Sequence, residues 1–273
     1  MLPSLTDVPA LFELRSIHGK GLGLFAKTSI ARGTRIIEEA PLIVTPQNGG
    51  APTKFNQFVE AWGCTTLDQR KAFLNLYRGR TIESTSEGLE KLARDDVNSS
   101  ANQHVTDENL TAFHIFQTNS VGMGDDGNSP LGVGVFASYS RVNHSCTPNV
   151  HNSYNPTLNK LTVHATRQIN ENEEILTSYI DIFQTREKRN ADLSEWDFRC
   201  RCKCCAAPNT ADSDRRRERL SDAEKELAAF MNGQRSHSRL SIPGNSQEAL
   251  EVAEVLLQVL REGGVTGIRV SGA

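Results

Sequence analysis

The N-terminal part of the chain mixes short β-branched and apolar runs with closely spaced glycines. The stretch LFELRSIHGKGLGLFAKTSIARGTRIIEEAPLIV, residues 11–44, carries Gly19, Gly21, Gly23 and Gly33. Glycines at this density mark positive φ angles or close approach of the backbone. The pattern therefore predicts short strands joined by tight turns.

A helical pattern follows over residues 54–120. Thr66 and Gln69 form a capping-box pair ahead of one apolar series, and the positions at helical spacing are Ala72, Phe73, Leu76, Tyr77, Leu110, Phe113 and Phe116. Between the two series, the polar stretch STSEGLEKLARDDVNSSANQ, residues 84–103, is predicted to be partly mobile.

Strand signals return at residues 131–140 and 160–169. In the second stretch Leu161, Val163 and Ala165 alternate with polar residues, which is typical of a half-buried strand. A turn over NENEE then leads to another short strand, residues 175–180.

The C-terminal part of the chain is predicted to be helical after a polar linker, residues 209–220. Ser221 and Glu224 are expected to cap a helix that carries Leu227 and Phe230. A last helix is expected over residues 247–262, before Gly263, with an apolar series of Ala249, Ala253, Leu256 and Leu260.

This order of elements fits neither a doubly wound sheet nor a barrel of alternating strands and helices. We therefore expect an α+β fold class, in which an irregular β domain of short strands carries a helical insertion and C-terminal helices.

Composition narrows the class of protein. The chain has 273 residues, 37% hydrophobic and 23% charged, with a formal net charge of −3. That charge gives no overall attraction to nucleic acid, and we expect the basic run at residues 215–219 to be a solvated helix face. The N-terminus lacks the pattern of a secretory signal, and no apolar run is long enough to span a bilayer.

The cysteines predict a metal site. Four of the six lie in CRCKCC, residues 200–205. In a chain without an export signal this crowding favours metal ligation and a reducing compartment over disulfides. Cys200, Cys202 and Cys205 supply three ligands, and structural zinc needs four. Cys146 is the candidate for the fourth, because Cys204 adjoins Cys205 and Cys64 lies in the helical insertion. Buried or redox-active thiols are the alternative.

The remaining candidate residues are ordinary when each is taken alone. The glycines of GKGLGLFA fit neither the dinucleotide fingerprint nor a phosphate-binding loop, so we favour a hairpin turn over a ligand-contacting loop. His144 and Asn143 by themselves suit structural roles, and Tyr179 suits a half-buried strand position.

Taken together, the motifs resemble a family. RVNHSCTPNV, residues 141–150, is followed by EEILTSYID, residues 173–181, then by FRCRCKCC, residues 198–205, with GKGLGLFA far upstream. In this order they are similar to the SET-domain protein lysine methyltransferases. The segment TSYIDIFQTREKRNADL and the terminal helices most resemble the SET-and-MYND branch, although the MYND zinc finger is missing. The resemblance covers about residues 11–208.

The resemblance implies a function and a set of site residues. It implies methyl transfer from S-adenosylmethionine to a lysine side chain, with zinc bound by Cys146, Cys200, Cys202 and Cys205. Tyr179 would be the catalytic residue, positioned to orient the amine and the methyl group. The implied cofactor-binding residues are Lys20, Gly21, Gly23, Asn143, His144, Tyr179 and Phe198. Phe136, Tyr139 and Phe183 are expected as walls of the lysine channel.

Two positions depart from the family pattern. Asn172 stands where glycine is common before the two glutamates, and asparagine tolerates the left-handed conformation expected there. Trp196 occupies a position where the SET-and-MYND branch usually has a second active-site tyrosine, which bears on channel width and on the number of methyl groups transferred.

The resemblance divides the chain into three parts. Residues 11–182 would form the SET domain, with the helical insertion at about 54–120. Residues 183–208 would form the post-SET zinc segment, and residues 209–273 a C-terminal helical tail.

The expected partner is a histone or non-histone protein that presents a lysine, with no direct nucleic-acid binding and no membrane. The expected location is the nucleus, the cytoplasm or both. A catalytically silent SET-fold interaction module and a generic zinc-stabilised binding domain are the alternative functions.

Overall fold

The computed structural model describes residues 10–46, 53–79, 106–124, 131–196, 198–208, 210–232, 243 and 245–262, without the side chains of residues 195, 255–257 and 259–262. The predicted mobile stretch at residues 84–103 lies outside them. None of the described helices combines the length and the apolarity needed to cross a bilayer.

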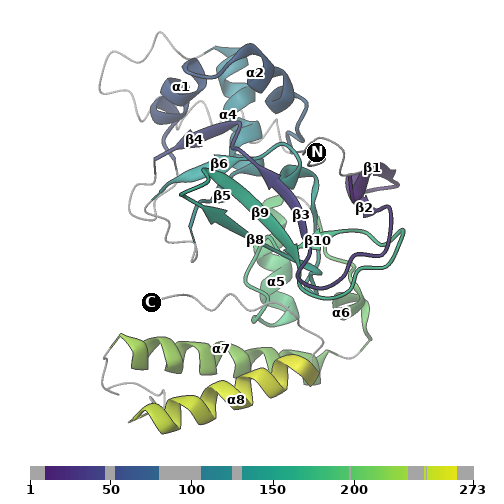
Figure 1. Ribbon diagram of the computed structural model, residues 1–273, viewed down its shortest axis with the longest axis vertical. Helices are drawn as coiled ribbons and strands as arrows, with labels where there is room; N and C mark the ends of the chain where they lie inside the picture. The colour runs from purple at the N-terminus through teal and green to yellow at the C-terminus, as the bar shows by residue number, and fades with distance from the viewer. Residues whose placement is uncertain are drawn as a thin grey trace, which may run out of the picture.

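Short strands build four small sheets in the described part of the chain, as predicted (Figure 1). The antiparallel hairpin pairs β1 (Phe12–Ile17) with β2 (Gly21–Ala26). One three-stranded sheet has the order β3 (Arg35–Glu39), β9 (Lys160–Ala165) and β8 (Val150–Asn155). The other has the order β4 (Ile43–Thr45), β6 (Val133–Val135) and β5 (Val121–Gly122). The parallel pair consists of β7 (Asn143–His144) and β10 (Leu176–Thr177).

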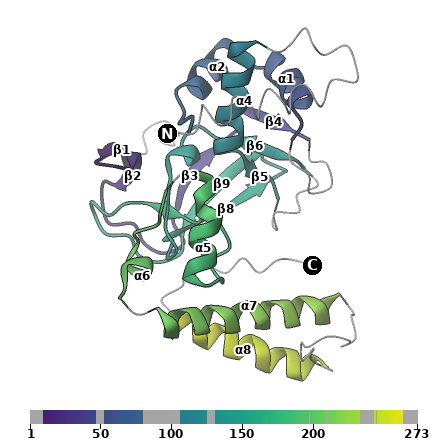
Figure 2. The ribbon, with the colours of Figure 1, turned by 180° about the vertical axis from the view of Figure 1, so that it is seen from behind.

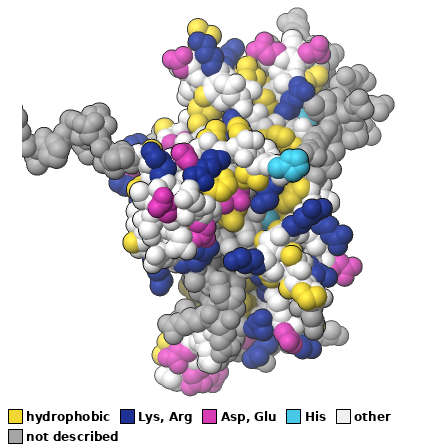
Figure 3. Space-filling model, turned by 90° about the vertical axis from the view of Figure 1, so that its right-hand side faces the viewer, with side chains coloured by type: hydrophobic (Ala, Val, Ile, Leu, Met, Phe, Trp, Pro, Cys, Tyr) yellow, Lys and Arg dark blue, Asp and Glu magenta, His cyan; other side chains and the backbone are white. Residues whose placement is uncertain are grey.

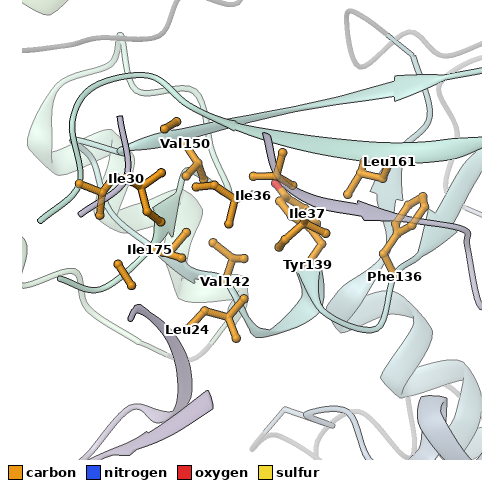
Figure 4. Close-up of a cluster of buried hydrophobic side chains, with 14 of the residues drawn as sticks. Leu24, Ile30, Ile36, Ile37, Phe136, Tyr139, Val142, Val150, Leu161 and Ile175 are labelled. Atoms are coloured by element: carbon orange, nitrogen blue, oxygen red, sulfur yellow. The ribbon is translucent and has the colours of Figure 1, made fainter. Parts of the chain in front are cut away.

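The main core lies between these sheets (Figure 4). The alternation predicted in β9 is confirmed, because Leu161, Val163 and Ala165 are all buried. Leu161 packs in the same cluster as Ile37 of β3 and Phe136, which follows β6. Burial of these branched side chains, at roughly 1.5–3 kcal/mol each, holds strands too short to be stable alone.

The helical insertion is confirmed and has an aromatic core of its own. Its helices are α1 (Phe55–Gly63), α2 (Leu67–Leu74) and α4 (Asp107–Asn119). The predicted capping box begins α2, since the Thr66 hydroxyl accepts a bond from the amide of Gln69 and the Gln69 side chain accepts one from the amide of Thr66. Phe58 is fully buried, and its ring centroid lies 5.2–6.4 Å from four other aromatic rings, those of Trp62, Phe73, Phe113 and Phe116.

A left-handed turn at Asn172 brings the segment NENEE, residues 170–174, against the N-terminal hairpin. Asn172 has a φ of 64°, the left-handed conformation expected at this position from the family resemblance. Its backbone N–H donates to the carbonyl of Ala26 at 2.8 Å, and its side-chain oxygen accepts a 2.6 Å bond from Arg15. The turn thereby places β10 beside β7, where the candidate residues lie.

The C-terminal part carries α5 (Arg186–Leu193), a 3-10 turn η3 (Ser194–Trp196), the short α6 (Lys203–Ala206), α7 (Ala211–Met231) and α8 (Ser246–Glu262). A second 3-10 turn, η2 (Tyr139–Arg141), precedes β7. Helices α7 and α8 lie side by side, and α5 lies between them and the sheets (Figures 1 and 2). The last helix matches its predicted bounds closely, while Gly263 and the side chains of Leu256 and Leu260 lie outside the described residues.

Three predictions for the segment after the cysteines are wrong. Residues 211–220 are the first half of α7 and not a linker, so Ser221 lies inside the helix and does not cap it. Charged residues such as Glu and Arg are good helix formers, and Asp212 and Asp214 in the first turn complement the helix dipole. The basic run is also not wholly solvated, because Arg217 is buried.

Replacing Phe58 with alanine tests the insertion core. Phe58→Ala leaves a cavity among four aromatic rings, so we expect the free energy of unfolding to fall by about 3–5 kcal/mol. Leu67→Ala, on an exposed side chain of α2, should change it by about 0.5 kcal/mol or less. Urea unfolding followed by circular dichroism measures both, and equal effects would contradict this packing.

Candidate functional site

Four cysteine sulfurs converge between the turn after β7 and the segment that leads into α6, with Cys205 inside that helix. The Sγ atoms of Cys146, Cys200, Cys202 and Cys205 all lie within 4.8 Å of one another. The Cys146 sulfur lies 3.8 Å from that of Cys200 and 3.5 Å from that of Cys205. Tetrahedral zinc with Zn–S bonds of about 2.3 Å holds its sulfurs roughly 3.8 Å apart. The four thiols therefore fit one structural zinc ion.

The other two cysteines lie apart from this cluster. The Cys204 sulfur faces the hydroxyl of Ser213 at 3.5 Å and the guanidinium of Arg217 at 3.3 Å. Cys64 is exposed at the end of α1. Adjacent residues point in different directions, so Cys205 joins the cluster while Cys204 turns toward α7.

The glycine-rich hairpin closes against the turn that carries Asn143. The Asn143 side-chain amide donates to the carbonyl of Leu22 at 3.1 Å and to the carboxylate of Glu174 at 2.8 Å. A Cβ atom on Gly23 would lie 2.7 Å from that amide nitrogen, so this approach requires glycine. Lys20 reaches the other oxygen of Glu174 at 3.3 Å.

The turn between β1 and β2 is a tight hairpin, as the glycines predicted. Gly19 and Gly21 have φ angles of 75° and 81°, and a Cβ at either position would meet no atom within 4 Å. The backbone of this turn is therefore open on that side. Its contact with a ligand stays a prediction.

His144 connects the cysteine cluster to Tyr179. Its Nδ1 atom accepts a 3.1 Å bond from the backbone N–H of Tyr179. A neutral imidazole that accepts at Nδ1 carries its proton on Nε2, and Nε2 lies 3.4 Å from the sulfur of Cys146. Burial lowers the pKa of His144 to about 4, so the ring is neutral at physiological pH.

Tyr179 is anchored at both its backbone and its hydroxyl. The hydroxyl donates to the carbonyl of Val142 at 2.9 Å. Burial raises the pKa of Tyr179 above its usual value, and the neighbouring Tyr139 and Glu174 act in the same direction. The hydroxyl is therefore protonated, and its oxygen keeps acceptor capacity for another donor.

Aromatic rings surround Tyr179. The ring centroid of Trp196 lies 5.6 Å from that of Tyr179, and the ring of Phe198 lies 6.3 Å away at an interplanar angle of 89°. Phe198 also lies 6.0 Å from His144 and is 37% exposed. A large exposed aromatic ring beside buried polar groups provides a surface on which a planar ligand can stack.

The residues expected as channel walls lie in different clusters. Phe136 packs in the main core against Tyr154, and Phe183 packs with Leu220 of α7. The hydroxyl of Tyr139 donates to Asn152 at 2.7 Å and lies 3.1 Å from the hydroxyl of Thr177. Their role as channel walls stays a prediction.

Several residues that organise the site were not predicted from the sequence. Glu174 binds both Asn143 and Lys20, and the Glu39 carboxylate accepts bonds from the amides of Ser138 and Tyr139 at the start of η2. Arg189 and Arg217 reach the cysteine cluster. The paired glutamates were a usable signal for Glu174, whereas long-range contacts made by Glu39 and the two arginines have no local pattern.

The surface near the site carries charges of both signs. Lys, Arg, Asp and Glu side chains all occur on the face that includes the β1–β2 hairpin and α6 (Figure 3).

Comparisons with known proteins find a family match and relatives for this chain. A family model described as the SET domain matches residues 21–180. The histone-lysine N-methyltransferase set5 of Schizosaccharomyces pombe is 29% identical over 221 residues, which cover 81% of this chain and 56% of that protein. The human N-lysine methyltransferase SMYD2 is 35% identical over 123 residues, 44% of this chain and 27% of that protein. The chain thus matches about half of one relative's length and about a quarter of the other's.

Among solved structures, a crystal structure of the SET domain of LSMT bound to lysine and AdoHcy matches with a TM-score of 0.46 and 13% identity. The match covers 94% of this chain and 72% of that chain.

Metal analysis of single cysteine variants tests the ligand set. We expect one zinc per chain in the purified protein, because four thiolates complete one tetrahedron. Cys205→Ser should lose the metal, and Cys204→Ser, the adjacent matched control, should keep it. Loss of zinc from Cys204→Ser together with retention in Cys205→Ser would reverse the assignment.

Proposed function

Because the chain belongs to the SET-domain family, we propose that it is an S-adenosylmethionine-dependent protein-lysine N-methyltransferase. Both relatives described above are named as lysine methyltransferases. The observation that carries the proposal is the double anchoring of Tyr179 beside an exposed aromatic ring, that of Phe198.

The cofactor site would be formed by residues from three segments. Lys20, Gly21 and Gly23 of the hairpin, with Asn143 and His144 of β7, would contact the amino acid and adenine portions of S-adenosylmethionine. Phe198 would stack on the adenine, since its ring is exposed beside His144. The cofactor supplies the electrophilic methyl group for the reaction.

Tyr179 would orient the reacting amine. The Tyr179 hydroxyl donates its hydrogen bond to the Val142 carbonyl, so the phenolic oxygen can face the substrate only as an acceptor. An amine N–H that donates to this oxygen has its lone pair turned toward the methyl group. Alignment of two reactants can lower a barrier by several kcal/mol.

The aromatic surroundings would also favour the reactive form of the substrate. A free lysine with a pKa of about 10.4 is charged at neutral pH and has no lone pair for attack. Burial against Tyr179 and Trp196 disfavours the ammonium form by desolvation. Tyr179 itself, with its raised pKa, stays protonated and is therefore not the base at neutral pH.

The substrate class and the location follow from the same proposal. The acceptor would be a lysine of a histone or of another protein, in the nucleus, the cytoplasm or both. The name of set5 favours a histone, whereas the name of SMYD2 leaves the protein open. Residues 11–182 would form the catalytic domain, 183–208 the zinc segment and 209–273 a helical tail.

Trp196 favours a second candidate function, a catalytically silent interaction module. Its indole packs on Tyr179 at the position where the SET-and-MYND branch usually has tyrosine. A larger ring there leaves less room for a substrate side chain. Such a module would keep its zinc and fold but transfer no methyl group.

Methyl transfer by the wild type separates the two functions, and its loss in Tyr179→Phe tests the role of Tyr179. The zinc-loaded protein, incubated with methyl-labelled S-adenosylmethionine and a lysate of unmodified proteins, should place label on lysine. Tyr179→Phe should lower the rate by about 10- to 100-fold, since a hydrogen bond of roughly 1.5–3 kcal/mol is lost.

The matched control is Tyr154→Phe. It removes a buried hydroxyl from β8, where the partner is Asn159, and should leave the rate unchanged. An active wild type with an equally active Tyr179→Phe would refute the proposed role of Tyr179. Absence of label from the wild type, with lysate and recombinant histones alike, would favour the silent module.

A further inference from the structure

Two buried arginines lie against the cysteine cluster. Arg189 of α5 is fully buried, and its guanidinium lies 3.8 Å from the sulfur of Cys205 and 3.7 Å from that of Cys204. Arg217 of α7 is 3% exposed and donates to the carbonyl of Cys146 at 3.1 Å. Arginine is rarely buried without an anionic partner.

The carboxylates around these arginines are too few to balance them. Among the described residues, Arg189 forms an ion pair with Asp214 at 3.7 Å, and Arg217 forms none. Asp214 also caps the backbone N–H of Arg186 at 2.9 Å, so it is shared with the start of α5. The Nε–H groups of both buried arginines lack a hydrogen-bond partner among the described residues. A buried cation without a counter-charge is strongly disfavoured.

The four-cysteine centre supplies the missing negative charge once it is loaded with metal. Four thiolates around one Zn²⁺ leave two net negative charges at the centre. The two guanidinium groups and Asp214 together carry one net positive charge, which offsets one of these two negative charges. Neutral thiols without metal would leave the arginines unbalanced, so charge balance in this region depends on the metal-bound form.

Arg217 also joins three segments that are distant in sequence. Besides the Cys146 carbonyl, its guanidinium contacts the carbonyl of Ile182 and, at 3.3 Å, the sulfur of Cys204. The apolar contact of α7 with the rest of the protein is small, with Leu220 packed on Ile182 and Phe183. The polar contacts of Arg217, together with those of Asp214, therefore hold the first half of α7 in place.

We propose that Arg189 and Arg217 are positioning residues of the metal centre. They balance the charge of the zinc-bound thiolates, and through Arg217 the occupied centre holds the C-terminal helix α7 against the turn at Cys146. Metal occupancy and the docking of α7 are thus coupled. This inference concerns the metal centre and does not require methyl transfer to occur.

Zinc affinity of arginine variants tests the charge balance. In the full-length protein, Arg217→Met and Arg189→Met remove the charge and keep much of the volume. Each should weaken zinc binding by about 10- to 100-fold, the usual effect of removing a partner of a metal ligand. Competition with a chromophoric zinc chelator measures the affinity. Arg217→Lys retains the charge and should bind zinc more tightly than Arg217→Met.

The matched control is Arg219→Met, an exposed arginine on the same helix, which should bind zinc as the wild type does. Wild-type affinity in both methionine variants would overturn the proposal. Equal weakening in Arg217→Lys and Arg217→Met would overturn the role of charge.

Hydrogen exchange of the wild type tests the coupling without any variant that must fold. Removing zinc with a chelator should speed amide exchange in residues 211–223 of α7, while α4 in the insertion should exchange as before. Unchanged exchange in α7 after complete zinc removal would overturn the coupling. Neither measurement uses catalytic activity, so failure here is distinct from failure of the proposed methyl transfer.

Discussion

The convergence of four cysteine sulfurs is the constraint on which the rest of the site depends. Cys146 and Cys200 are 54 residues apart in the chain, yet their sulfurs lie 3.8 Å apart. Closing a flexible loop of that length costs on the order of 3.5 kcal/mol beyond a constant. The binding free energy of structural zinc in zinc-finger peptides is about 10–16 kcal/mol, which exceeds this cost of loop closure. A metal at these sulfurs therefore suffices to fix the segment that carries Trp196 and Phe198 over β7.

The sulfur of Cys146 also helps to set the position of Tyr179, through His144. His144 lies between Cys146 and the backbone of Tyr179, with one ring nitrogen toward each. Because its pKa is lowered to about 4, the ring keeps one defined pattern of donor and acceptor at neutral pH. The Val142 carbonyl then fixes the tyrosine hydroxyl. A distortion of the metal centre would reach the proposed reacting group through a single imidazole.

Local patterns predicted much of the fold. The capping box of Thr66, the alternation in β9 and the left-handed turn at Asn172 each depend on interactions within a few residues, and each is confirmed. The predicted start of α7 was wrong because its first half is highly charged, a composition that also occurs in linkers. Arginine is seldom buried, so the sequence favours a solvated Arg217, and its burial depends on partners that are distant in the chain.

The sequence predicted the motif residues of the site but not the distant residues that hold them. Cysteine spacing and ordered motifs pointed to the residues that the structure brings together around Cys146 and Tyr179. Glu174 and Arg189 act through contacts with residues that are far away in the sequence, such as Lys20 and Cys205. No periodicity or spacing encodes such contacts, and only the folded arrangement reveals them.

If the metal centre organises the proposed cofactor site, zinc should govern the affinity for S-adenosylmethionine. Calorimetric titration of S-adenosylmethionine into zinc-loaded and zinc-depleted protein measures this dependence. We expect binding to the zinc-loaded protein and a loss of at least about 10-fold in affinity, equivalent to 1.4 kcal/mol, without zinc. Equal affinity in the two forms would refute the dependence, because Phe198 and His144 would then be positioned without the metal.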